Sequence, residues 1–147
     1  MNAYTTFVFE PLDWPAMEDA AGRLIGTRNF VSFCTRPIDQ PRLIRTIDRL
    51  TITPCDRFRF IDFFARSFVR GMVRNIVGWL LSVGRGIHPP AVIDQLLAKT
   101  RKDQSVRPAP PQGLYLVKIW YDGDPMPGWF APLPARADPA DDEEIDE

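Results

Sequence analysis

Three arginines at four-residue spacing are the side chains best suited to chemistry in this sequence. Arg66, Arg70 and Arg74 enter an apolar stretch whose periodicity predicts a central, mostly buried helix over Phe68–Val83. The first two are expected to reach solvent, whereas Arg74 lies deeper among apolar residues. An unpaired buried charge costs several kcal/mol, so this guanidinium requires an anion. Arg74 is therefore a candidate to hold a catalytic carboxylate or a phosphate.

The alternative role for Arg74 is structural, as a salt bridge to Asp62 or Asp48. Pattern alone favours this structural role over the functional one. Gly78, in the same predicted helix, costs about 1 kcal/mol relative to alanine. This cost predicts that another backbone segment packs closely against the helix at that position.

Metal and thiol chemistry have little support. Cys34 and Cys55 are too few for a disulfide framework or a four-ligand metal site, and they are expected to be small core or loop residues. The one histidine, His88, precedes two prolines and is predicted to be a surface residue rather than a base. No metal site is expected.

The charge distribution favours a polyanionic partner. The 147 residues are 45% hydrophobic and 25% charged, a composition typical of one globular domain. The net charge of -1 conceals sixteen bases against six acids from Arg23 to Arg107, and seven acids in the last ten residues. Arginine, which forks onto phosphates and stacks on bases, greatly outnumbers lysine. The alternative is a solvated basic face balanced by an acidic tail.

The order of predicted elements indicates an α+β fold, a mostly antiparallel sheet with helices packed on one face. The elements are a helix capped by Asp13 and ending at Gly26, a strand over Asn29–Phe33, a hairpin of Arg45–Thr53 and Phe58–Phe64, the helix Phe68–Val83, a helix over Ala91–Lys99, and a strand over Leu114–Tyr121.

The chain is expected to hold one domain over residues 1–122, followed by a Pro-rich and then acidic tail over residues 123–147 that is weakly ordered. No stretch is apolar for long enough to span a membrane, and no basic-then-apolar signal opens the chain. A cytoplasmic location is therefore expected.

One segment has a specific resemblance. Residues 68–78, Phe-Val-Arg-Gly-Met-Val-Arg-Asn-Ile-Val-Gly, resemble the signature helix of the tRNA pseudouridine synthase A family. Three other segments match that family in the same order, from about Leu12 to Tyr121. They are Gly26-Thr-Arg-Asn-Phe30 with Ser32-Phe33, Arg45-Thr-Ile47, and Pro108-Ala-Pro110 with Gly113-Leu-Tyr-Leu116.

The resemblance implies an enzyme that isomerises uridine to pseudouridine in the tRNA anticodon arm, without cofactor or metal. In that family an aspartate attacks the nucleoside, and the uracil detaches, turns and rejoins through carbon. Arg74 matches the arginine that pairs with the aspartate, and Leu114 matches the apolar residue packed against the uracil. Phe68 and Met72 are expected to wall the pocket. The tRNA backbone would be bound by Arg66, Arg70, Arg85, Arg101 and Lys102.

The departures from the family pattern are equally informative. The family's aspartate lies in a Gly-Arg-Thr-Asp-x-Gly-Val-His segment of an N-terminal half, which this sequence does not contain. Arg45-Thr-Ile-Asp48 aligns with a different, noncatalytic segment. Arg28 and Asn29 replace a usual His and Asp. We therefore expect a C-terminal half that works with an N-terminal half chain, and we keep a homodimer as a further candidate assembly.

Three functions remain open at this point. The chain is an enzyme half completed by an N-terminal partner, a catalytically inactive RNA-binding module, or a structural interaction protein derived from this fold. The joint presence of Arg74, Leu114 and Gly78 favours the enzyme half, because a pure RNA-binding module has no use for a buried arginine without a partner.

Overall fold

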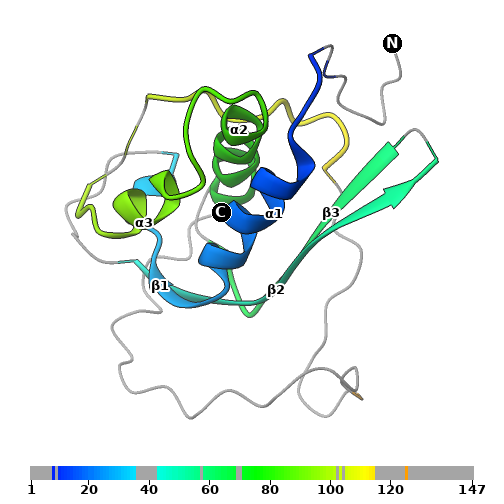
Figure 1. The fold of residues 1–147 in the computed structure, drawn as a ribbon. Coiled ribbons are helices and arrows are strands. Elements are labelled where there is room, and N and C mark those ends of the chain that lie inside the picture. The colour runs from blue at the N-terminus through cyan, green and yellow to red at the C-terminus, as the bar shows by residue number, and fades with distance from the viewer. Residues whose placement is uncertain are drawn as a thin grey trace.

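In the part of the chain that the structure describes, the helices lie on one face of a three-stranded antiparallel sheet (Figure 1). The computed structural model describes residues 8, 10–35, 43–56, 58–68, 71–101, 103, 105–114 and 125. Its elements are α1 (Trp14–Leu24), β1 (Gly26–Asn29), the 3₁₀ helix η1 (Val31–Phe33), β2 (Ile44–Cys55), β3 (Phe58–Ala65), α2 (Met72–Gly84) and α3 (Val92–Leu97). The predicted α+β class, with helices on the sheet, is confirmed.

Helix α1 begins where the sequence predicts. The Asp13 carboxylate accepts a hydrogen bond from the Ala16 N–H (3.1 Å), and Pro15 occupies the first turn, where no backbone donor is needed. Four residues of α1 at helical spacing are buried in the core: Met17, Ala20, Ala21 and Leu24. The start of α1 is joined to the end of α2, because the Asp13 N–H donates to the Gly84 carbonyl (2.8 Å).

The sheet has the order β1-β2-β3, and β2 with β3 forms the predicted hairpin. The hairpin turns at Asp56, whose φ of 53° is a left-handed conformation that aspartate tolerates. A register shift between Ile47 and Arg49 interrupts the β2–β3 pairing at Asp48. Ile47 and Leu50 of β2 are buried in the core.

The prediction of a strand over Asn29–Phe33 is wrong. Strand β1 ends at Asn29, and the chain then forms η1. The Asn29 side-chain oxygen accepts hydrogen bonds from the N–H groups of Val31 (3.2 Å) and Leu43 (2.9 Å), which favours a turn over further pairing. The turn buries Phe30 and Phe33 together, with ring centroids 6.1 Å apart.

Helix α2 begins at Met72, not at the predicted Phe68, and it ends at Gly84, one residue after the predicted Val83. Gly71 immediately before it has a φ of 72°, which no α-helix contains. A Cβ at Gly71 would lie 1.4 Å from the Thr35 Oγ1, so this start depends on glycine. Residues 69 and 70 lie outside the described part of the chain.

The core is formed mainly between α1, α2, η1 and β2. Its largest fully buried side chains are Phe30, Phe33, Met17, Leu24, Ile47, Met72, Ile76, Leu80, Ile93, Leu96, Val31 and Val83. Helix α3 contributes Ile93 and Leu96 to the core, and it is shorter than the predicted Ala91–Lys99. The Ser32 hydroxyl donates to the Leu96 carbonyl (2.6 Å) and joins η1 to α3.

Several predictions fall outside the described residues. They are all of the predicted strand Leu114–Tyr121 except Leu114, and the tail over 123–147 except Pro125. Within the part of the chain that is described, no helix has the length and apolar character needed to cross a membrane.

The segment after α3 is anchored by Asp103. The Asp103 N–H donates to the Ser32 carbonyl (3.1 Å), and its carboxylate accepts from the Lys99 ammonium and the Ser105 N–H (2.8 Å). Burial raises the pKa of this carboxyl, but the hydrogen bonds from Lys99 and Ser105 together outweigh that effect and lower the pKa to about 2. The ionised form is therefore the one that stabilises the fold.

Replacing Asp103 by asparagine is expected to destabilise the chain by roughly 2 kcal/mol at pH 7. The folded pKa lies below the ordinary 3.8, so this stabilisation is complete above about pH 4 and lost as the pH falls toward 2. Urea unfolding of wild type, Asp103→Asn and Asp56→Asn at several pH values measures it. Asp56 is exposed at the hairpin turn and serves as the control. An equal loss at pH 7 and pH 2 would contradict the prediction.

Candidate functional site

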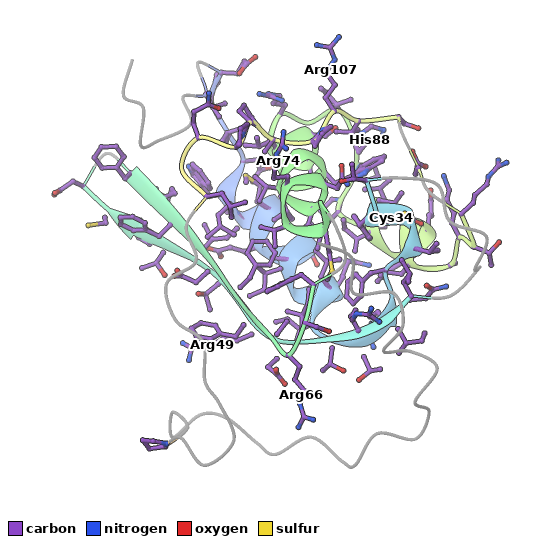
Figure 2. All side chains as sticks on the ribbon, turned by 180° about the vertical axis from the view of Figure 1, so that it is seen from behind. Cys34, Arg49, Arg66, Arg74, His88 and Arg107 are labelled. Carbon is purple, nitrogen blue, oxygen red and sulfur yellow. The ribbon has the colours of Figure 1, made fainter. Side chains whose placement is uncertain are left out.

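Arg74 lies in the first turn of α2, half-buried, beside the segment that follows α3 (Figure 2). Its Nε donates a hydrogen bond to the Ala109 carbonyl (2.8 Å), and the Ala109 N–H donates to the Arg74 carbonyl (2.9 Å). Backbone and side chain of Arg74 are therefore both held by the same residue.

The structural salt bridge considered for Arg74 does not form. Asp62 is exposed on β3, and Asp48 lies at the register shift of β2, where it faces the charge of Arg66. Burial raises the pKa of Asp48, and the Arg66 charge acts in the opposite direction. Among the described residues, no carboxylate forms an ion pair with Arg74.

The guanidinium of Arg74 therefore has bonding capacity left. Arginine carries five N–H donors, of which Nε uses one on Ala109. The two terminal nitrogens present four donors in a planar fork, the geometry that suits a carboxylate or phosphate. The chemistry of these donors suits an anion.

The three residues predicted to line the substrate pocket differ in how far they are exposed to solvent. Leu114 exposes 51% of its surface. Phe68 is half-buried and packs edge-on against Phe63, with ring centroids 6.5 Å apart. Met72 has 0% exposure and lies in the core, so the prediction that it lines the substrate pocket is corrected: it has no free surface in this structure.

Three of the five residues predicted to bind the tRNA backbone lie in the described part of the chain. Arg66 is exposed and projects away from the body of the domain (Figure 2). Arg85 forms an ion pair with Glu10 (Nε to Oε2 3.4 Å), and Arg101 is exposed. Arg70 and Lys102 lie outside the described residues.

The remaining reactive residues have structural environments. His88 is half-buried, not simply on the surface: its Nδ1 lies 2.6 Å from the Ser82 hydroxyl and its ring packs against Trp79. Cys34 is buried and Cys55 exposed. Across the described ranges, no group of three or more His, Cys, Asp or Glu residues is arranged to hold a metal ion.

Sequence analysis matched Pro108-Ala-Pro110 to the family but did not predict that this segment holds Arg74. Gly78 indicated that a backbone packs against α2, and the structure confirms it: a Cβ there would lie 2.3 Å from the Arg107 carbonyl oxygen. The glycine indicates where on α2 another backbone packs, but it does not indicate which segment that backbone belongs to. Ala109 has no side-chain chemistry by which it could have been singled out.

Comparison with known proteins gives consistent matches. The family model described as tRNA pseudouridine synthase matches residues 20–122. The chain is 36% identical over 126 residues to "tRNA pseudouridine synthase A" of Acidiphilium cryptum, covering 86% of this chain and 49% of that protein. It is 34% identical over 120 residues to the protein of the same name from Polaromonas naphthalenivorans, covering 79% and 46%. "tRNA pseudouridine synthase A 1" of Bacillus cereus is 38% identical over 112 residues, covering 76% and 45%. The chain thus spans about half the length of the curated relatives it matches.

Proposed function

Because this chain belongs to the tRNA pseudouridine synthase family, we propose that it forms the C-terminal half of a catalytic unit that isomerises uridine to pseudouridine in the tRNA anticodon arm. The nucleophilic aspartate comes from an N-terminal half. The observation that carries the proposal is Arg74, whose guanidinium is held by Ala109 and forms no ion pair with any carboxylate of the described residues.

The role of Arg74 follows from electrostatics. A guanidinium next to a carboxylate favours the ionised form and lowers its pKa, so the aspartate remains a nucleophile at neutral pH. The planar fork also fixes the direction of the carboxylate. The bond from the sugar to the uracil N1 breaks, the base turns, and a new bond forms from the sugar to C5. The C5 proton leaves, and N1 takes up a proton.

The base contact in this proposal is made by Leu114, with Phe68 at the wall of the pocket. A target uridine must leave the stack before it can react, and an apolar side chain then replaces its lost stacking contacts. An apolar surface also lets the detached uracil turn, because it offers no hydrogen bond that holds one orientation. The 51% exposure of Leu114 leaves its side chain accessible for this contact.

The proposed partners are the tRNA, the N-terminal half and, as a further assembly, a second copy of the unit. Contacts to the tRNA backbone are assigned to Arg66, Arg70, Arg85, Arg101 and Lys102. No cofactor or metal enters the proposed reaction, and the cytoplasm is its proposed location. An RNA-binding module without catalysis is the competing function that the experiments below separate from this one.

RNA binding by the chain is expected to weaken steeply with salt. Between Arg23 and Arg107 the bases exceed the acids by ten (16 − 6), and each phosphate that is neutralised releases counterions. If about six phosphates are contacted, affinity falls roughly a thousandfold between 50 and 200 mM salt. Filter binding of anticodon-arm RNA over this range measures the slope. A flat response would favour the structural interaction protein instead.

The function itself is tested by mapping the product. Unmodified tRNA is incubated with the full chain and the N-terminal half of the Acidiphilium cryptum synthase, and pseudouridines are located by carbodiimide labelling and primer extension. We expect stops confined to the anticodon arm. Binding without stops would indicate the inactive RNA-binding module, and stops elsewhere would contradict the proposed substrate site.

A further inference from the structure

Residues 107–109, here called the strap, run along the first turns of α2 in the direction opposite to the helix. The Arg107 carbonyl lies against Gly78, and Ala109 lies against Arg74, one turn nearer the start of α2. In Figure 1 the segment that contains the strap is drawn in yellow and passes beside α2. Ala109 is almost fully buried, with 7% exposure, so its polar groups are directed at α2 rather than at water.

The contact at Gly78 determines how close the strap can lie. A Cβ added at Gly78 would be 2.3 Å from the Arg107 carbonyl oxygen and 3.3 Å from the Pro108 Cα. The first distance is far inside van der Waals contact, and both atoms belong to backbone, which cannot rotate away. Any residue larger than glycine must therefore displace the strap from α2.

Because Ala109 binds Arg74, the position of the guanidinium depends on the position of the strap. The two hydrogen bonds between Ala109 and Arg74, at 2.8 and 2.9 Å, tie the Arg74 side chain and backbone to one peptide unit. An arginine side chain loses considerable rotamer entropy when it is fixed. The hydrogen bonds to Ala109 already restrict the Arg74 side chain, so less entropy is lost when a partner binds. Nε is occupied, so the terminal nitrogens are the groups left to face an incoming anion.

We propose that Gly78 and Ala109 are positioning residues, which use the strap to fix the orientation in which Arg74 meets the catalytic carboxylate. The inference rests on the proposed function, and it identifies the strap as the element that orients the Arg74 side chain. Small displacements of a catalytic group can lower rates by about a hundredfold. Displacement of the strap therefore affects turnover more than it affects binding of RNA.

The test compares Gly78→Ala with Gly22→Ala in the full chain. Gly22 is a matched control, because it also lies inside a helix and an added Cβ there meets nothing within 4 Å. The first readout is the Arg74 Nε–Hε signal in ¹⁵N NMR of the chain alone, whose exchange with water is slowed by the bond to Ala109. The second is kcat and KM for anticodon-arm RNA in the assembly with the Acidiphilium N-terminal half.

We expect Gly78→Ala to speed the exchange of the Nε proton and to lower kcat about tenfold to a hundredfold, with KM changed less than about twofold. Gly22→Ala should change neither readout. If Gly78→Ala fails to fold, Ala109→Pro, which removes the N–H that donates to Arg74, is expected to give the same two changes.

Two results would overturn the inference while leaving the proposed function intact: an unchanged Nε signal in Gly78→Ala, or a changed signal with unchanged kcat. An assembly of wild-type chain that forms no pseudouridine would instead overturn the proposed function, whatever the NMR signal shows. The measurement on the chain alone thus separates the two failures.

Discussion

Replacing Arg74 by alanine is expected to lower the turnover of the assembled synthase by about a thousandfold. The substitution removes the cation that keeps the nucleophilic carboxylate ionised and aimed, and no basic side chain of the described residues shares its hydrogen bond to Ala109. Single-turnover kinetics with anticodon-arm RNA measures the loss. Arg74→Lys retains the charge but lacks the planar fork, so its turnover should lie between those of alanine and wild type.

The pH dependence distinguishes this role from a structural one. Without the guanidinium, the pKa of the partner carboxylate rises, so the acid limb of the rate profile should move to higher pH in Arg74→Gln. Arg28→Ala is the control, because Arg28 is exposed in β1 and donates to the neighbouring Thr27 carbonyl. A uniform loss of rate at every pH, accompanied by lower stability to urea, would contradict the assignment.

The second large effect concerns the chain by itself. We expect the isolated chain to release no tritium from RNA carrying 5-tritiated uridine, because it lacks the family's Gly-Arg-Thr-Asp segment. Two acids of the described residues were considered as partners of Arg74: Asp48 lies within the influence of the Arg66 charge, and Asp62 is exposed on β3. Neither forms an ion pair with Arg74. Addition of the N-terminal half should start tritium release, and turnover by the chain alone would contradict the prediction.

Local sequence signals predicted the elements that depend on local interactions. The cap at Asp13 and the buried face of α1 came from a capping side chain and a helical period, and the hairpin came from two apolar strands separated by a turn. Helix α2 was found by its apolar face. In each case the residues that determine the structure lie within a few positions of one another.

The errors arose where distant contacts decide the conformation. Asn29 ends β1 partly through its bond to the Leu43 N–H, and Gly71 starts α2 where Thr35 occupies the space of a Cβ. Neither partner is near in sequence. Met72 was assigned to the pocket by resemblance, whereas the fold places it in the core.

The site was predictable only in part for the same reason. Burial of Arg74 in an apolar stretch indicated the need for an anion, and Gly78 indicated a close backbone. That Ala109 supplies the acceptor depends on how the segment after α3 returns across α2, which follows from tertiary packing rather than local pattern. The alternative of an internal salt bridge could be excluded only once Asp48 and Asp62 were located.

The most direct test of the central claim is the association of the chain with the N-terminal half, measured by titration calorimetry as a double-mutant cycle. Arg74→Ala should weaken binding of the half that carries the aspartate by at least about tenfold, as expected for a close charge pair. With the aspartate replaced by asparagine, the same substitution should cost almost nothing. Equal weakening with both forms of the half would show that Arg74 does not receive its carboxylate there.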